Sequence, residues 1–322
     1  MLRKLLFAGS ILVLAALFVS AHAQQYPTRA VTLVVGFAPG GPSDVVARVV
    51  SRKLEQVLGQ PIVIDNRGGA GGNIAAEDVA GAGADGYTLL LGTNGILAAN
   101  PSLYRKINYK PEDFAPISLI GVQPNVLLVN PSVAATTLPE LITLAKGNPG
   151  KLNYGSGGHG TAAHLSGELF KSEAKVDIVH VAYKGTGPAL QDVVAGHVHM
   201  MFSATSPVLS LIQEGKVRAL AVTTSKRTAA LPDVGTVSEL ALPGFDAATW
   251  HGLVAPAGTS VEVIGRLHRA VVTALDDREV KASLTKLGVD LVGNTPAEFD
   301  AYIKSEIPKW AAVIKASGAR LD

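Results

Sequence analysis

The chain has 322 residues, of which 48% are hydrophobic, and its formal net charge at pH 7 is +2. Because Arg3 and Lys4 supply two of the positive charges in an N-terminal segment of their own, the remainder of the chain is neutral. A neutral balance argues against a nucleic-acid partner, since phosphate binding needs clustered Lys and Arg. Cysteine is absent, which excludes thiol nucleophiles, Cys-ligated metals and disulfides.

The N-terminus has the pattern of a secretory signal peptide. Arg3 and Lys4 precede an uncharged apolar run over residues 5–20, and Ala21-His22-Ala23 matches the small-x-small cleavage pattern. The run is shorter than the roughly 20 residues that a membrane span needs. We therefore expect residues 1–23 to be a cleaved signal peptide and the mature protein to be exported; an uncleaved signal anchor is the alternative.

Short apolar strands and amphipathic helices alternate along the first third of the mature chain, which is typical of a parallel α/β architecture. We expect Ser43 or Asp44 to cap the first helix and Gly59 to end it. The order is strand, helix, strand, helix, strand, which is half of a doubly wound sheet. The expected ranges are strands at 30–37, 62–65 and 87–92, with helices at 43–58 and 73–80.

The alternation resumes downstream, and two strand-like stretches at 117–129 and 247–255 could cross between two lobes. This predicts an α/β fold in which each lobe is a mixed, mostly parallel sheet flanked by helices. The first lobe would be discontinuous, built from residues 26–121 and 249–322, and the second would span 122–248. The other expected elements are strands at 126–129, 152–155, 178–182, 199–202 and 218–223, with helices at 138–146, 162–171, 187–195, 206–214, 261–276 and 296–317.

Several loops follow expected strands, where open α/β sheets bind ligands. In Phe37–Asp44 the glycines and the next helix N-terminus suit an anionic oxygen, although the same glycines could serve the turn alone. Gly155–Thr161 offers backbone N–H groups, two hydroxyls and an imidazole. Smaller candidates are the Tyr183–Pro188 turn, Thr93 with Asn94, and Ser203; in each of these, hydroxyls could simply cap helices.

Other chemistries fit less well. Gly155, Gly157 and Gly160 match GxGxxG, but the acidic residue that a dinucleotide site needs is missing from the end of the next strand. A Gly-x-Ser-x-Gly elbow is also missing, which leaves an exported hydrolase as a weak alternative. His159 and His164 are five residues apart, so they would not share a helical face, and a zinc site needs three or four convergent ligands. We therefore expect no catalytic residue, no metal and no cofactor.

Four blocks of sequence, taken in order, indicate a protein family, whereas any single glycine loop would be too common to do so. They are TLVVGFAPGGPSDVVAR, IVIDNRGGAGGNIAAEDVA, NYGSGGHGTAAHLSGELF and HVAYKGTGPALQDVVAGHVHMMF. Together they resemble the Bug (TctC-type) family of solute-binding proteins of tripartite tricarboxylate transporters, from about Tyr26 to the C-terminus. The resemblance implies a two-lobed periplasmic binding protein of the type II class. It would close on a small carboxylated solute and deliver that solute to membrane permease subunits.

The resemblance also implies that the carboxylate is held by backbone N–H groups and hydroxyls of two facing loops, often through water. We expect a monomer that is not an enzyme; a sensing subunit for a membrane receptor would have the same fold and site. The solute could be a di- or tricarboxylate, an amino acid, an aromatic acid or even an uncharged molecule. The candidate ligand-binding residues are Phe37, Ala38, Pro39, Gly40, Gly41, Asp44, Thr93, Asn94, Ser156, His159, Gly160, Thr161, His164, Tyr183, Lys184, Gly185 and Ser203.

Overall fold

The computed structural model describes residues 26–321, so the predicted signal peptide lies outside the described residues. Its strands run in the order β2-β1-β3-β9-β4-β7-β5-β6, with β8 and β10 also pairing with β4. We call β1, β2, β3, β9, β10 and the start of β4 the first sheet, and the end of β4 with β5 to β8 the second sheet. The strand bounds are β1 Val31–Val35, β2 Ile62–Asn66, β3 Thr88–Thr93, β4 Phe114–Val129, β5 Asn153–Ser156, β6 Val179–Ala182, β7 Met200–Ala204, β8 Arg218–Val222, β9 Ala248–Pro256 and β10 Asp290–Leu291.

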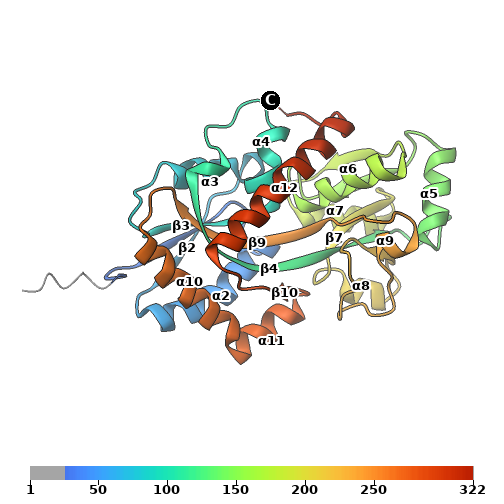
Figure 1. The fold of residues 1–322 in the computed structure, drawn as a ribbon. Helices are drawn as coiled ribbons and strands as arrows, with labels where there is room; N and C mark the ends of the chain where they lie inside the picture. The colour runs from blue at the N-terminus through green and yellow to red at the C-terminus, as the bar shows by residue number, and fades with distance from the viewer. Residues whose placement is uncertain (1–25, 322) are drawn as a thin grey trace, which may run out of the picture.

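Strands β4 and β9 join the two sheets. They pair antiparallel from Phe114 opposite Pro256 to Pro124 opposite Ala248, and β4 then continues into the second sheet beside β7 and β8. Figure 1 shows the two long strands running together between the halves of the molecule. The outer strands pair in parallel, whereas every pair formed by β4 or β9 is antiparallel. The predicted mixed α/β architecture is confirmed, and its parallel part lies away from the centre.

Helices cover both faces of each sheet (Figure 1). Alternate residues of β4 show this directly, since Leu127 packs in one apolar cluster and Val126 and Leu128 pack in another. Within residues 26–321, no helix is long and apolar enough to cross a bilayer. The longer helices are α2 Pro42–Leu58, α3 Asn73–Ala80, α5 Leu138–Gly147, α6 Ala162–Ala174, α7 Thr186–Ala195, α10 Val261–Asp276, α11 Arg278–Lys286 and α12 Pro296–Ser317, and the short ones are η1 Ala70–Gly72, η2 Gly95–Ala99, α4 Asn100–Leu103, η3 Pro111–Asp113, α8 Leu209–Gln213 and α9 Val237–Leu240.

The ends of α2 test the expected helix signals. Gly59 ends the helix with a left-handed φ of 72°, as predicted. The predicted cap at Ser43 or Asp44 is wrong, because α2 already begins at Pro42 with Gly41 as its N-cap. Proline suits the first turn of a helix, since its missing N–H would have no partner there. The side chains of Ser43 and Asp44 are therefore available for other contacts.

Helix α12 lies across the paired strands β4 and β9 and reaches α6 of the second half (Figure 1). The buried carboxylate of Glu306 holds it there, because its Oε2 accepts from the indole N–H groups of Trp250 at 3.2 Å and Trp310 at 2.9 Å. Lys309 pairs with Oε1 of the same carboxylate at 2.9 Å. Paired in this way, Glu306 avoids the cost of an isolated buried charge.

The close packing of α12 on β9 predicts a large effect from one added methyl group. A Cβ at Gly252 would lie 2.1 Å from Cζ of Phe299, whose ring is fully buried. We expect Gly252→Ala to lower the free energy of unfolding by about 1–3 kcal/mol, because the ring must shift within a filled core. Urea unfolding measures this. In the control Gly147→Ala the new Cβ has no neighbour within 4 Å, so equal losses in both variants would contradict the explanation.

Candidate functional site

The Phe37–Asp44 loop lies against two other segments of the first half. Asn66 donates from Nδ2 to the carbonyl of Phe37 at 3.0 Å. A Cβ at Gly72 would lie 2.7 Å from Ile96 and 3.6 Å from the carbonyl of Gly36, which places η2 beside the same loop. Ala38, Pro39 and Gly40 are exposed, whereas Asp44 is buried. The carboxyl ends of β1, β2 and β3 therefore form one surface, as an open α/β sheet predicts.

Asp44 occupies part of the predicted anion-binding loop with its own negative charge. Its Oδ2 accepts from the backbone N–H of Gly40 at 2.9 Å and from Nε of Arg48 at 2.9 Å. Burial raises the pKa of Asp44, but the hydrogen bonds from Arg48 and Gly40 outweigh it and hold the pKa below its ordinary value. The N–H of Gly41 donates to the carbonyl of Ala38 at 3.3 Å. Two N–H groups that the sequence offered to a solute are thus already used.

The end of β3 is the second part of the first-half surface. Thr93 and Asn94 are both buried, and the π-helical turn η2 follows them directly. Such turns are rare and are frequent at functional sites, and the sequence did not predict this one. Among the described residues, Nδ2 of Asn94 has no hydrogen-bond partner. A buried amide without a partner costs about 1–3 kcal/mol, so a bound group that accepts from it would be stabilised.

The Ser156–His164 loop is tightly bonded to itself. The hydroxyls of Ser156 and Thr161 both donate to the carbonyl of Gly158, at 3.0 and 2.7 Å. In return, the N–H of Gly158 donates to Ser156 Oγ at 3.1 Å, and the N–H of Gly160 donates to Nδ1 of His164 at 3.3 Å. Thr161 is the N-cap of α6. These side chains hold the shape of the loop. Their hydroxyl and imidazole groups are used within it, so they are less available to a solute than the sequence predicts.

The Tyr183–Gly185 turn is bonded to the same loop. The N–H of Tyr183 donates to Ser156 O at 3.0 Å, and the N–H of Gly185 donates to Gly157 O at 3.1 Å. The Tyr183 hydroxyl donates to Asp192 at 2.5 Å, and Lys184 is exposed. Ser203 is buried in β7, and its hydroxyl donates to the carbonyl of Ala204 at 3.1 Å. The second-half candidates therefore meet around the carboxyl ends of β5, β6 and β7.

The two groups of loops touch along a line that we call the seam, formed by Gly71, Gly95 and Asn100 of the first half and His159 and Gly160 of the second. A Cβ at Gly95 would lie 2.4 Å from the carbonyl oxygen of Gly160, and one at Gly160 would lie 2.8 Å from Oδ1 of Asn100. A Cβ at Gly71 would lie 3.3 Å from the carbonyl of His159. Glycine is thus required at the seam by the close approach of two backbones.

His251 of β9 is not among the residues that the sequence predicts for the site. It is fully buried, and its Nε2 lies 3.0 Å from the hydroxyl of Ser43 at the start of α2. In the antiparallel pair of β3 and β9, His251 lies opposite Thr93, the residue before Asn94. Burial lowers the pKa of His251 to about 4. His251 and Ser43 therefore form a buried polar pair next to Thr93.

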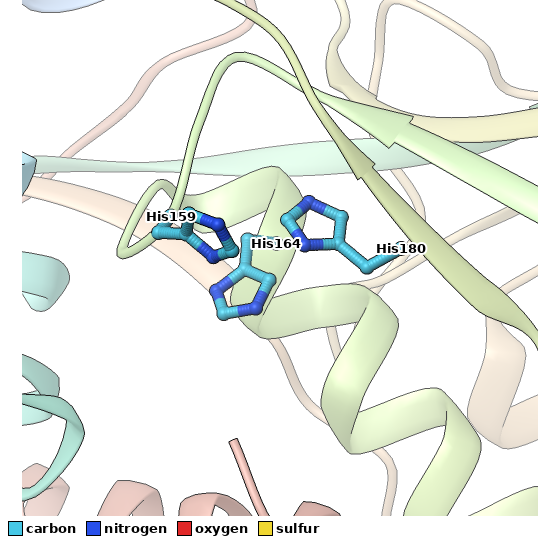
Figure 2. A group of neighbouring side chains, drawn as sticks. All are labelled: His159, His164 and His180. Atoms are coloured by element: carbon cyan, nitrogen blue, oxygen red, sulfur yellow. The ribbon is translucent and has the colours of Figure 1, made fainter. Parts of the chain in front are cut away.

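The expectation that the histidines do not converge is wrong. His159 and His164 are neighbours, because His159 lies in the loop before α6, where helical spacing does not apply. His180 of β6, which the sequence reading left out, completes the group, and one ring nitrogen of each residue lies within 4.8 Å of the others. Figure 2 shows the three imidazoles gathered between that loop and the strand. Burial lowers the pKa of His164 and of His180 to about 3, and the neighbouring imidazoles add to both shifts.

A comparison with protein families identifies the chain. Residues 46–319 match the family model described as "Tripartite tricarboxylate transporter family receptor". The chain belongs to this family. Protein BugT of Bordetella pertussis (strain Tohama I / ATCC BAA-589 / NCTC 13251) is 38% identical over 323 residues, covering 100% of this chain and 99% of the relative. The predicted family is therefore confirmed, and the family consists of solute-binding receptors.

Solved structures of the family show the same fold. The structure described as "R. palustris Rpa4515 with adipate" has a TM-score of 0.84 at 40% identity and covers 91% of this chain and 98% of its own. The structure described as "MatC (Rpa3494) from Rhodopseudomonas palustris with bound malate" has a TM-score of 0.83 at 38% identity and covers 90% and 100%. The two-lobed periplasmic binding-protein architecture is therefore confirmed.

One pair in the site has the separation of a nucleophile and its base. Oγ of Ser156 lies 2.7 Å from Nε2 of His180. Ser156 is fully buried, however, and its hydroxyl proton is directed to the carbonyl of Gly158. A serine nucleophile must present its oxygen to a substrate carbonyl. The pair therefore fits a structural role in the receptor family better than the exported-hydrolase alternative.

The lowered histidine pKa values predict how stability depends on pH. An unfolded histidine binds a proton below about pH 6.5, whereas His251 stays neutral down to about pH 4 in the folded state. The unfolded state then binds more protons, so the free energy of unfolding should fall as the pH drops from 6.5 to 4, by about 1.4 kcal/mol per pH unit for each such group. We expect His251→Gln to flatten this decline in urea unfolding measured at several pH values. The control is His197→Gln, at a side chain that is 72% exposed; an equal flattening there would contradict the assignment.

Proposed function

We propose that this protein is a periplasmic receptor that captures a small carboxylated solute at the seam between its two lobes and passes it to membrane permease subunits. The observation that carries the proposal is the set of buried, unpartnered polar atoms beside the seam. Among the described residues these include Asn94 Nδ2 and Asn100 Oδ1. Native proteins pair nearly all buried polar groups, and exceptions call for an explanation such as a bound molecule or water.

Donors on both sides of the seam support an anionic ligand. Asn94 contributes an amide N–H from the first lobe, and the N-terminus of α6, a helix of 13 residues, contributes the positive end of its dipole from the second. Hydrogen bonds to a charged group stabilise by about 1.5–3 kcal/mol each. Bridging water would complete the contacts, because Gly40, Gly158 and Gly160 use their N–H groups within the loops.

We propose that solute binding closes two lobes, with residues 26–121 and 249–322 in the first and 122–248 in the second. The change of sheet within β4, between Pro124 and Asn125, supports a hinge there. A ligand that bridges both lobes binds the closed form more tightly and so shifts the population toward it. The remaining candidate residues, from Phe37 to Gly41 and from Tyr183 to Gly185, would line the entrance.

The class of solute is inferred from solved structures of related proteins. Of the two solved structures of the family, one is with adipate and the other has bound malate, and both molecules are dicarboxylates. We therefore propose a di- or tricarboxylate, an amino acid or an aromatic acid, captured without chemical change by a monomer. A cleaved signal peptide over residues 1–23 would place the protein in the periplasm.

Thermal melting of the protein from Gln24 onward tests the solute class. The sample should be unfolded and refolded first, so that any solute carried through purification is removed. A ligand present at a hundredfold excess over its Kd stabilises by about 2.7 kcal/mol, which raises the midpoint by several degrees. We expect such shifts from a few carboxylates and none from matched uncharged amides. A shift from an uncharged solute alone would refute carboxylate binding and leave the receptor fold untouched.

A substitution at Asn94 tests the location of the site. Asn94→Ala removes a buried donor that has no partner among the described residues. It should therefore weaken solute binding by about 1–3 kcal/mol while leaving the melting point of the solute-free protein nearly unchanged. Calorimetric titration with the carboxylate found in the melting screen measures this. The matched control is Asn148→Ala, where the lost bond is to Leu144 O in α5. Wild-type affinity in Asn94→Ala would remove Asn94 from the site.

A further inference from the structure

The clustered histidines His159, His164 and His180 differ from one another in exposure. His164 is buried, His180 is half-buried and His159 is exposed. The ring centroids of His164 and His180 are 4.3 Å apart, and that of His159 lies 5.3 and 5.0 Å from them. They come from the loop before α6, from α6 itself and from β6. The group thus has a closed inner side and an open outer side.

The imidazoles are close enough to share one ion. Their candidate donor nitrogens all lie within 4.8 Å of one another. Tetrahedral coordination at about 2.0–2.1 Å would bring ligand nitrogens to roughly 3.3 Å apart, so each nitrogen would have to move by less than about 1 Å while the rings turn toward the ion. Neutral imidazole is a good ligand for Zn²⁺, Cu²⁺, Ni²⁺ and Fe²⁺.

The neighbours of the rings favour one nitrogen of His180 as the metal ligand. Oγ of Ser156 lies 2.7 Å from Nε2 of His180, and an Nε2–H that donates to this oxygen would leave Nδ1 of His180 with its lone pair. Metal-bound histidines commonly donate their second ring N–H to an oxygen in this way. In His164, Nδ1 accepts a long 3.3 Å bond from the N–H of Gly160, and an ion bound at either ring nitrogen of this imidazole would displace that bond.

We propose that His159, His164 and His180 form a binding site for one first-row divalent transition metal ion, of which Zn²⁺ is the best fit. Three histidines leave a fourth position of a tetrahedral ion open for water or a carboxylate oxygen. Because His159 is exposed, that position would be accessible from solvent. This site goes beyond the proposed function, because the ion would bind whether or not the chain captures a carboxylate.

The first experiment is a titration of the chelator-treated, tag-free protein from Gln24 onward with Zn²⁺ and, separately, with Co²⁺. Calorimetry should give one Zn²⁺ per chain, and Co²⁺ should produce the visible absorption bands of a tetrahedral ion, which Zn²⁺ then abolishes. Neither titration includes a carboxylate, so its failure is separate from any failure of the solute proposal. The absence of saturable binding at one equivalent would overturn the metal site.

Variants locate the ion. His159→Ala changes an exposed side chain in a loop and should leave the fold intact, and His180→Ala provides a second test from another element. Each should weaken Zn²⁺ binding by more than about tenfold, since loss even of an outer-shell partner costs 10–100-fold. The control, His197→Ala, removes an exposed imidazole paired with Asp192. Wild-type affinity and unchanged Co²⁺ bands in His159→Ala and His180→Ala, or an equal loss in His197→Ala, would overturn the assignment.

Discussion

The antiparallel pairing of β4 with β9 is the constraint on which the rest of the structure depends. It joins the outer, parallel strands of the first sheet to the second sheet, and β4 belongs to both. Helix α12 seals this junction from one side through Phe299 and Glu306, which explains why Gly252 has no room for a side chain. One apolar cluster consequently extends from Val34 of the first sheet to Phe202 of the second. The two halves of the molecule therefore share part of their apolar core.

The seam is the functional consequence of that junction. The carboxyl ends of the parallel strands in both sheets carry loops that approach one another, and backbone contact at Gly95 and Gly160 leaves no space for side chains. The proposed solute would supply partners to the buried polar groups there that have none within the described residues. The proposed carboxylate would contact both sides of this line and so favour the arrangement in which the halves meet.

Local elements were the most predictable part of the fold. The strands around Val34 and Leu90 and the helix that ends at Gly59 follow from apolar periodicity and from turn residues. The short elements were missed because they depend on packing: η2 is fully buried after β3, and β10 has two residues that pair with β4. In the site, the sequence identified the glycine loops but overestimated how many of their backbone N–H groups are free to bind a solute. Asp44, Ser156 and His164 use those N–H groups, and such short side-chain bonds compete with any ligand.

The sequence by itself determined the alternating architecture, the loops at the strand ends and the family, because these depend on local periodicity and on blocks of contiguous residues. The tertiary structure decided which loops touch and which side chains share a space. His159 and His180 meet because β5 and β6 pair in parallel, with Tyr154 opposite His180, and because the loop after β5 turns back over that pair. A shift of register by one residue would turn His180 to the other face of the sheet, and strand register is set by the packed core as a whole.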